Sequence, residues 1–188
     1  MARCAEASVV VDVGAEYGFY TDLALRCRPG GLRVIAFEPE ADRFASLRQR
    51  FHGHECVVLH PVALSNRADI VEARRPGAEW SLSIAWPNHG EMRQLVETVV
   101  FDDLYPNTAV DVVKIDVEGA EALVLAGMRQ LLARARPTLF IEFHAPRGNA
   151  ATLDRLQDRD RLAQVLDSVG YRVDNTCKDG GRTVLRPV

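Results

Sequence analysis

The chain has 188 residues, of which 47% are hydrophobic and 26% charged, and its formal net charge at pH 7 is −3. We predict one compact domain over residues 1–188, since domains average about 150 residues, and the hydrophobic fraction excludes a disordered or collagen-like chain. The small negative charge, with no arginine-rich stripe beside aromatic residues, argues against a nucleic-acid partner.

The four cysteines follow no CxxC or zinc-site spacing, and we interpret them as thiols in a reducing compartment. The N-terminus lacks an apolar signal core, and no apolar run approaches the ~20 residues that a membrane span needs. We therefore predict a cytoplasmic protein with no membrane partner.

The first half of the chain alternates predicted strands with predicted helices. β-branched and apolar runs predict strands at 8–13, 32–37 and 56–60, and helical periodicity predicts helices at 17–28 and 40–52. Parallel strands need a crossover long enough to hold a helix, so this alternation indicates a doubly wound parallel sheet.

The periodicity weakens after the third strand, where we expect a variable insert over about 66–101 that contains a hairpin, and then returns. The remaining predicted elements are strands at 70–73, 96–101, 110–117, 138–144, 171–174 and 183–186, and helices at 118–135 and about 152–169. We expect the last two strands to form an antiparallel hairpin. The predicted fold is thus α/β, with a doubly wound, mostly parallel, seven-stranded sheet, an inserted hairpin and a C-terminal hairpin.

The loop after the first strand reads Val11-Asp-Val-Gly-Ala-Glu-Tyr-Gly18, and it lies where open α/β sheets bind ligands. Gly14 and Gly18 allow a tight turn and close backbone approach. In the dinucleotide fingerprint GxGxxG, a glycine stands at the position of Glu16 and faces the pyrophosphate. A carboxylate there would repel the phosphates by about 1 to 4 kcal/mol at effective dielectric constants of roughly 80 to 20. The loop therefore favours S-adenosylmethionine, whose ammonium Asp12 would receive directly or through water.

Glu38 ends the second predicted strand, where an acid can accept hydrogen bonds from both ribose hydroxyls of an adenosine. Adenine would lie against Pro39 and the segment Val62–Ser65. The complete set of predicted cofactor-binding residues is Asp12, Gly14, Ala15, Glu16, Tyr17, Gly18, Glu38, Pro39, Ala63, Leu64 and Asp116. Each feature also has an explanation without a ligand. The glycines can serve only to form the turn, and Glu38 can be an acid on the protein surface.

Several blocks of sequence, in chain order, carry a family resemblance. They are Val11–Gly18, Ala36-Phe-Glu-Pro39, Val62-Ala-Leu-Ser65, Phe101-Asp-Asp-Leu104, Val113-Lys-Ile-Asp-Val-Glu-Gly-Ala-Glu121 with Val124-Leu-Ala-Gly127, and Phe140-Ile-Glu-Phe-His144. Together they resemble the FkbM family of class I methyltransferases. The resemblance implies a Rossmann-like fold, S-adenosylmethionine as cofactor, and methyl transfer to a hydroxyl of a sugar or other small metabolite.

The chain departs from this family in two respects. The family usually has Asn where this chain has Glu16, and related members carry a segment before the first strand that covers cofactor and acceptor. About seven residues precede the first predicted strand here. We therefore expect that the loop at 75–90, or a partner subunit in a homo-oligomer or other assembly, completes the lid. The alternative is an open site that binds weakly.

Strand alternation places Lys114 and Asp116 on one face of their strand, and Glu142 and His144 on one face of the next. A lysine within an apolar strand needs carboxylate partners, so we predict a buried ion row of Asp12, Lys114 and Glu142. The alternative is that Lys114 extends along the strand to reach solvent at an edge.

Asp116 and His144 end neighbouring strands and are the predicted catalytic residues. Either side chain can take the proton from an acceptor hydroxyl during methyl transfer. In a second hypothesis, Asp116, Glu118 and His144 hold a divalent metal that lowers the pKa of that hydroxyl. The structural alternatives are a hydrogen-bonded His144 at a strand end and a Glu118 that stabilises the first turn of a helix.

Three ring-bearing residues, Trp80, Trp86 and His89, flank the variable loop and are candidate contacts for a sugar or other small-molecule acceptor. Such residues also serve to hold a loop against the core. Two other functions stay open from the sequence: a nicotinamide-dependent oxidoreductase, and a cofactor-binding subunit that is non-catalytic or depends on a partner.

Overall fold

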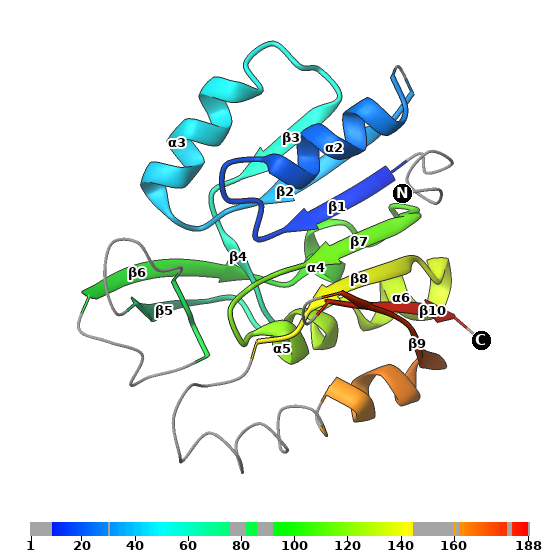
Figure 1. Cartoon of the computed structure of the whole chain (residues 1–188). Coiled ribbons are helices and arrows are strands. Elements are labelled where there is room, and N and C mark those ends of the chain that lie inside the picture. Colours follow the sequence, from blue (N-terminus) through cyan, green and yellow to red (C-terminus); the bar gives the residue numbers. More distant parts are fainter. Residues whose placement is uncertain are drawn as a thin grey trace.

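The computed structural model describes residues 9–29, 31–75, 82–85, 92–144, 160, 162–179 and 182–187. Its main sheet has seven strands in the order β3-β2-β1-β7-β8-β10-β9 (Figure 1). In that order the strands are Val57–His60, Arg33–Phe37, Val9–Val13, Val112–Ile115, Thr138–Glu142, Arg182–Pro187 and Tyr171–Asp179. The first five are parallel, and β10 is antiparallel to both of its neighbours. The predicted α/β class with a mostly parallel sheet is confirmed.

The chain order reverses beside β1, which has β2 on one side and β7 on the other. These three central strands are buried almost throughout, as expected for a parallel sheet covered on both faces. The carboxyl ends of β1 and β7 therefore form a topological switch point, the position at which open α/β sheets bind ligands.

Two hydrophobic clusters cover the two faces of the sheet. One packs the strands against α2 (Phe19–Cys27) and α3 (Ala41–Arg50), and the other packs them against α4 (Phe101–Leu104), α5 (Glu121–Ala126), α6 (Arg129–Ala135) and the helical residues 162–168. The first cluster takes Val10, Val34, Ala36 and Val112 from the strands, and the second takes Val11, Val13, Ile35, Phe37, Val113 and Ile115. Successive side chains thus alternate between the faces, as strand geometry requires.

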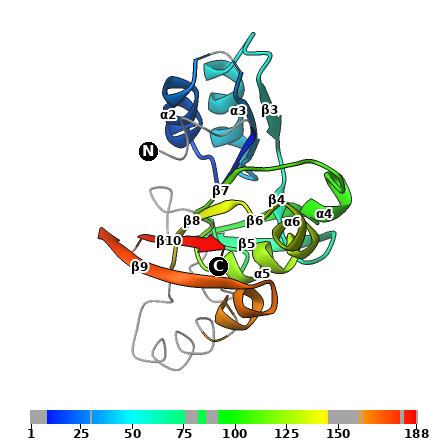
Figure 2. The same cartoon turned by 90° about the vertical axis from the view of Figure 1, so that its right-hand side faces the viewer.

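The helices of the described ranges include none with the length and hydrophobicity of a bilayer-spanning segment. Figure 2 shows α2 and α3 at one end of the molecule and β9 toward the other.

The prediction of one continuous helix over 118–135 is wrong, because the structure has two helices there, α5 and α6, which are separated at Gly127. A Cβ on Gly127 would lie 2.1 Å from the carbonyl oxygen of Ser65, so the chain passes too close for any side chain. The carboxylate of Asp102 then accepts the backbone N–H groups of Gln130 (2.8 Å) and Leu131 (2.9 Å) at the start of α6. The break is therefore set by tertiary contacts.

The insert after β3 forms a separate three-stranded sheet in the order β4-β6-β5. β5 (Asp69–Arg75) and β6 (Met92–Val99) pair antiparallel, and the two-residue strand β4 (Ala63–Leu64), which sequence patterns did not predict, pairs with β6. Phe101, predicted as a strand residue, instead begins α4. This small sheet lies beside the switch point and supplies part of the site described next.

Candidate functional site

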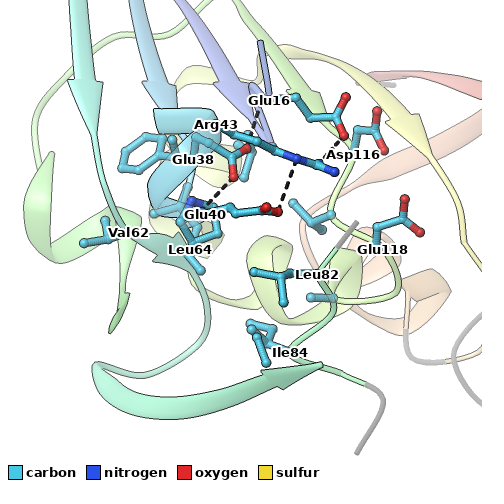
Figure 3. A pocket seen from close by; sticks show the side chains of 18 residues that line it. Glu16, Glu38, Glu40, Arg43, Val62, Leu64, Leu82, Ile84, Asp116 and Glu118 are labelled. Atoms are coloured by element: carbon cyan, nitrogen blue, oxygen red, sulfur yellow. Dashed lines mark hydrogen bonds and ion pairs between the residues drawn. The ribbon is translucent and has the colours of Figure 1, made fainter. Parts of the chain in front are cut away.

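A cavity lies at the carboxyl ends of β1, β2 and β7, with the small sheet beside it (Figure 3). This is the position at which open α/β sheets bind ligands. The predicted cofactor residues that line it are Gly14, Glu16, Glu38, Pro39, Ala63, Leu64 and Asp116.

Three other predicted cofactor residues, Ala15, Tyr17 and Gly18, do not line the cavity. Ala15 is buried and its N–H donates to the carbonyl oxygen of Phe37 (3.0 Å), and the Tyr17 side chain is largely exposed. Gly18 has a φ of 81°, and a Cβ there would lie 2.4 Å from the ring of Phe51. These residues shape the loop around the cavity and start α2, so the prediction that they contact a cofactor is not supported by their positions.

Gly14 brings the loop after β1 against the loop after β7. Its φ is 76°, and a Cβ at this position would lie 1.8 Å from the carbonyl oxygen of Asp116. Its N–H donates to the carbonyl oxygen of Phe37 at 3.0 Å. Only glycine fits this backbone, so Gly14 allows the two loops to meet at the wall of the cavity.

Glu38 is buried at the wall of the cavity, and both its carboxylate oxygens are fixed by the backbone. Oε2 accepts the N–H of Glu16 (2.8 Å), and Oε1 accepts the N–H of Glu40 (2.9 Å). Burial raises the pKa of Glu38, and these two hydrogen bonds oppose part of that rise. Each oxygen keeps a second lone pair, so the carboxylate can accept two further donors such as a pair of hydroxyls.

The charged lining of the cavity is strongly acidic. It comprises five carboxylates and one guanidinium, from Glu16, Glu38, Glu40, Asp116, Glu118 and Arg43. Arg43 pairs with Glu16 and, at 3.2 Å, with Glu40, so it offsets part of the repulsion that the sequence predicts at Glu16 alone. Cations behind the wall balance part of this charge, because Arg75 pairs with Glu40, Lys114 lies 3.7 Å from Asp116 and His144 lies 3.7 Å from Glu118.

Sequence reasoning missed Arg43, because one arginine in a largely polar helix has no distinguishing spacing. It also missed the link from the insert, in which Arg75 of β5 pairs with Glu40. Both arginines are only slightly exposed, with side-chain fractions of 9% for Arg43 and 14% for Arg75. They hold the segment after β2 between α3 and the insert.

Residues 82–85 form another part of the wall that the sequence did not indicate. Leu82 and Ile84 line the cavity, and the buried Ser83 donates its hydroxyl hydrogen to the carbonyl oxygen of Glu118 (2.7 Å). Trp80, Trp86 and His89, the predicted acceptor contacts, lie outside the described residues.

Below the cavity, Lys114 is buried beside Asp12, as the predicted ion row requires. The two residues are level in the β1–β7 register, and Lys114 Nζ lies 3.2 Å from Asp12 Oδ1. Lys114 also donates to the carbonyl oxygen of Gly14 (2.6 Å). Burial lowers the pKa of Lys114, but Asp12 and Asp116 outweigh it and leave this pKa raised. Lys114 therefore does not extend to solvent.

The third member of the predicted row is wrong, because Phe140 stands opposite Lys114 and Glu142 lies two residues further along β8. Asp12 also differs from its predicted role. It is 1% exposed, does not line the cavity, and accepts the Thr21 hydroxyl (2.8 Å) in addition to its ion pair with Lys114. Its carboxylate thus supports the loop rather than facing a ligand.

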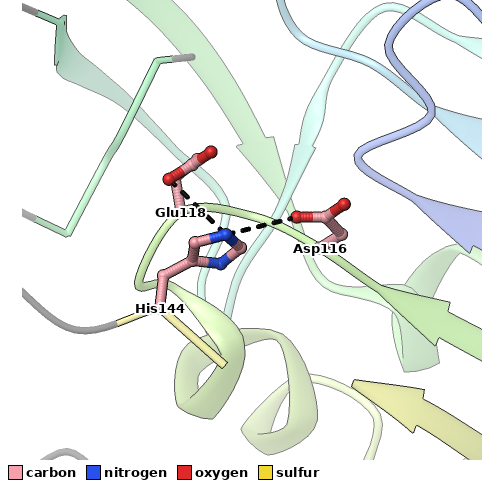
Figure 4. Close-up of side chains that lie close together, drawn as sticks. All are labelled: Asp116, Glu118 and His144. Carbon is pink, nitrogen blue, oxygen red and sulfur yellow. Dashed lines mark ion pairs between the residues drawn. The ribbon is translucent and has the colours of Figure 1, made fainter. Parts of the chain in front are cut away.

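His144 and Asp116 lie together at the ends of β8 and β7, as predicted. His144 Nε2 is 3.7 Å from Asp116 Oδ1 and 3.7 Å from Glu118 Oε2, and Nδ1 is 3.1 Å from Glu121 Oε1 (Figure 4 shows the first two contacts). Burial lowers the pKa of His144, but the hydrogen bond to Glu121 and the surrounding carboxylates raise it to about 9. Carboxylates thus face both ring nitrogens, and the role of His144 as a base stays a prediction.

The two carboxylates beside His144 also have defined environments. Burial raises the pKa of Asp116, and Lys114 opposes that rise. Glu118 has a φ of 52° and precedes α5, so the alternative that it stabilises the first turn of this helix is wrong; Glu121 occupies that turn. Glu121, which the sequence did not single out, fixes the orientation of the imidazole.

Comparisons with known proteins agree with this architecture. A sequence model of the Methyltransferase FkbM domain matches residues 12–173, whereas no curated protein gives a significant match. The solved FkbM methyltransferase from Methylobacillus flagellatus KT is 20% identical, with a TM-score of 0.62 over 96% of this chain. This chain spans 43% of the length of that structure.

Two further solved structures share the fold. Fibrillarin from Aeropyrum pernix, solved with natively bound S-adenosyl-L-methionine, is 14% identical to this chain, and the TM-score is 0.56. The match covers 96% of this chain and 66% of the fibrillarin chain. A SAM-dependent methyltransferase from Aquifex aeolicus is 13% identical, with a TM-score of 0.52 over 95% of this chain and 80% of its own. At these identities the likeness concerns the fold alone, but the sequence match extends over most of the chain. The chain therefore belongs to the FkbM family of methyltransferases.

Proposed function

We propose that the protein transfers a methyl group from S-adenosylmethionine to a hydroxyl of a sugar or other small metabolite. The observation that carries the proposal is the buried Glu38 at the switch point, whose carboxylate is fixed by two backbone N–H groups beside a cavity lined mainly by carboxylates. A donor with a sulfonium and an ammonium is attracted to such a wall, whereas the pyrophosphate of a nicotinamide dinucleotide is repelled. Membership of the FkbM family supports methyl transfer, and the fibrillarin neighbour with bound S-adenosyl-L-methionine supports the donor.

The residues of the cavity fit the donor in two places. Glu38 has hydrogen-bond capacity for two ribose hydroxyls. Pro39, Ala63 and Leu64 offer an apolar wall for adenine. When bound, S-adenosylmethionine supplies an electrophilic methyl carbon on its sulfur.

Asp116 is the proposed proton acceptor, because its side chain lines the cavity whereas His144 does not. As the acceptor oxygen forms its bond to the methyl carbon and the sulfur–carbon bond breaks, the hydroxyl proton passes to the Asp116 carboxylate. Lys114 and His144 approach this carboxylate from either side, at 3.7 Å each, and hold its orientation. His144 is thus a positioning residue in the proposed reaction.

Donor binding is tested by calorimetric titration of the protein with S-adenosylhomocysteine and, separately, with NADH. We expect heat and saturation with the first ligand and none with the second. Glu38→Gln should weaken binding by roughly 10- to 100-fold, because it removes the charge from two ribose hydrogen bonds. Glu97→Gln, at an exposed acid of β6, is the matched control and should bind like the wild type. Absence of binding by S-adenosylhomocysteine, or saturable binding of NADH, contradicts the proposal.

The acceptor is identified by incubating the protein with a pooled metabolite extract and methyl-labelled donor, followed by mass spectrometry. We expect one labelled product class carrying the methyl group on oxygen. Asp116→Asn should lose this product while it still binds S-adenosylhomocysteine. A wild-type protein that binds donor but labels nothing in any extract would instead support a partner-dependent, cofactor-binding role.

A further inference from the structure

We propose that Asp116, Glu118 and His144 form a binding site for one divalent cation of the Mn²⁺ or Mg²⁺ type at the edge of the cavity. Each residue offers one ligand atom, and these three atoms all lie within 4.8 Å of one another. Figure 4 shows the imidazole of His144 lying between the carboxylates of Asp116 and Glu118, with its ring nitrogen facing both.

The spacing of the ligand atoms suits a small six-coordinate ion. With metal–ligand distances of about 2.1 Å, neighbouring ligand atoms are ~3 Å apart and opposite ones ~4.2 Å apart. His144 Nε2 lies between these limits, at 3.7 Å from Asp116 Oδ1 and 3.7 Å from Glu118 Oε2. Small side-chain rotations would bring all three atoms onto one ion.

The imidazole is already oriented as in a metal site. Glu121 is 1% exposed, and its Oε1 accepts the N–H of Gly119 (3.0 Å), which fixes the carboxylate. The same oxygen is 3.1 Å from His144 Nδ1, and a carboxylate only accepts, so Nδ1 carries the hydrogen. Nε2 is therefore the nitrogen that faces Asp116 and Glu118, and a cation that binds there displaces the Nε2 proton to solvent. A buried carboxylate behind a histidine is the usual outer support of a metal ligand.

The charges and exposure around the centre favour a cation with open coordination positions. Glu142 Oε1 lies 4.0 Å from His144 Nε2, which adds a further carboxylate beside the three ligand residues. Lys114 approaches the Oδ2 atom of Asp116, so Oδ1 is the oxygen turned toward the imidazole. A mixed carboxylate and imidazole set suits Mn²⁺, and side-chain exposures of 22–28% leave room for water or substrate.

The position of the site gives the cation a role in catalysis, and this step rests on the proposed function. Asp116 and Glu118 both line the cavity, so an ion between them can bind the acceptor hydroxyl. A bound cation lowers the pKa of that hydroxyl. Asp116 would then hold the cation through Oδ1 and take the hydroxyl proton on Oδ2, which lies 3.7 Å from Lys114 Nζ.

The test is titration of the complete protein with Mn²⁺, followed by calorimetry and by electron paramagnetic resonance. We expect one ion per chain, with imidazole nitrogen coupling in the spin-echo spectrum of the wild type. His144→Gln should weaken binding at least 100-fold, and Glu121→Gln 10- to 100-fold through loss of the outer support. Glu97→Gln should leave it unchanged. Absence of saturable binding, unchanged affinity in His144→Gln, or a spectrum without nitrogen coupling overturns the proposal, and the wild-type spectrum decides it if the variant fails to fold.

Failure of this inference is distinguishable from failure of the proposed function. Binding of S-adenosylhomocysteine without Mn²⁺ binding removes the cation site alone, and turnover is then unaffected by a chelator. Mn²⁺ binding with nitrogen coupling, but without binding of S-adenosylhomocysteine, retains the site and removes the methyltransferase proposal.

Discussion

Replacing Lys114 by methionine should destabilise the protein strongly, because the ammonium is the charged partner of a buried carboxylate. Asp12 is 1% exposed, and it would keep only its hydrogen bond from Thr21. The carbonyl oxygen of Gly14 would also lose a donor at 2.6 Å. The variant thus leaves an uncompensated charge directly beneath the loop that forms the cavity.

The expected loss follows from the cost of breaking buried ion pairs, about 3 to 5 kcal/mol. Domains unfold with about 5 to 15 kcal/mol, so this loss is a large part of the total stability. For a urea dependence of about 2 kcal/mol per molar, the unfolding midpoint should fall by about 2 M. Combining Lys114→Met with Asp12→Asn removes the orphaned charge and should restore most of the midpoint.

Urea unfolding followed by far-ultraviolet circular dichroism measures these midpoints. Arg33→Met is the matched control, since it also replaces a strand cation by methionine but at an exposed position, and should change stability by no more than ~0.5 kcal/mol. If Lys114→Met unfolds at the same urea concentration as Arg33→Met, the reasoning about the Asp12–Lys114 pair is refuted.

Three further changes test other parts of the structure by the same unfolding assay. Gly127→Ala should cost about 1 to 3 kcal/mol, because its Cβ would lie 2.1 Å from the carbonyl oxygen of Ser65; a neutral result would contradict this close approach. Asp102→Ala should cost about 1 to 3 kcal/mol by freeing two N–H groups at the start of α6, of which that of Leu131 is buried, and wild-type stability would show that they find other partners. Burial lowers the pKa of His60 below 6.5, so its contribution to stability is complete above pH 6.5 and is lost as the pH falls through the folded-state pKa. The free energy of unfolding should therefore depend less on pH below 6.5 in His60→Gln than in the wild type, and equal slopes would exclude this group as the cause.

The central strands could be predicted from the sequence because burial on both faces requires continuous runs of apolar, often β-branched residues. β1, β2 and β7 all lie within the predicted strands. Gly14 and Glu38 could be predicted because a ligand site at a switch point needs a glycine for the tight turn after β1 and a carboxylate after β2 that accepts hydrogen bonds. Gly14 and Glu38 accordingly line the cavity.

The remaining errors arose where tertiary contacts decide the outcome. Alternation gives the face on which Glu142 lies but not its level, which depends on how β8 enters the sheet. The backbone N–H of Thr138 donates to the carbonyl oxygen of Asp111 (2.8 Å), and this register places Phe140 beside Lys114. Similarly, Arg43 enters the site through partners that are distant in the sequence, and no local pattern records such pairs.

Three side chains of the described part of the insert reach the segments around the main sheet. Arg75 pairs with Glu40, Gln94 donates to the carbonyl oxygen of Pro39, and Ser83 donates to that of Glu118. Ala63, Ala73 and Val96 form a small hydrophobic cluster of their own, whereas Leu64 and Val99 pack into a cluster of the main sheet. Substitutions at Leu82 or Ile84 should therefore reshape one wall of the cavity with less cost to the scaffold than substitutions at Leu64 or Val99.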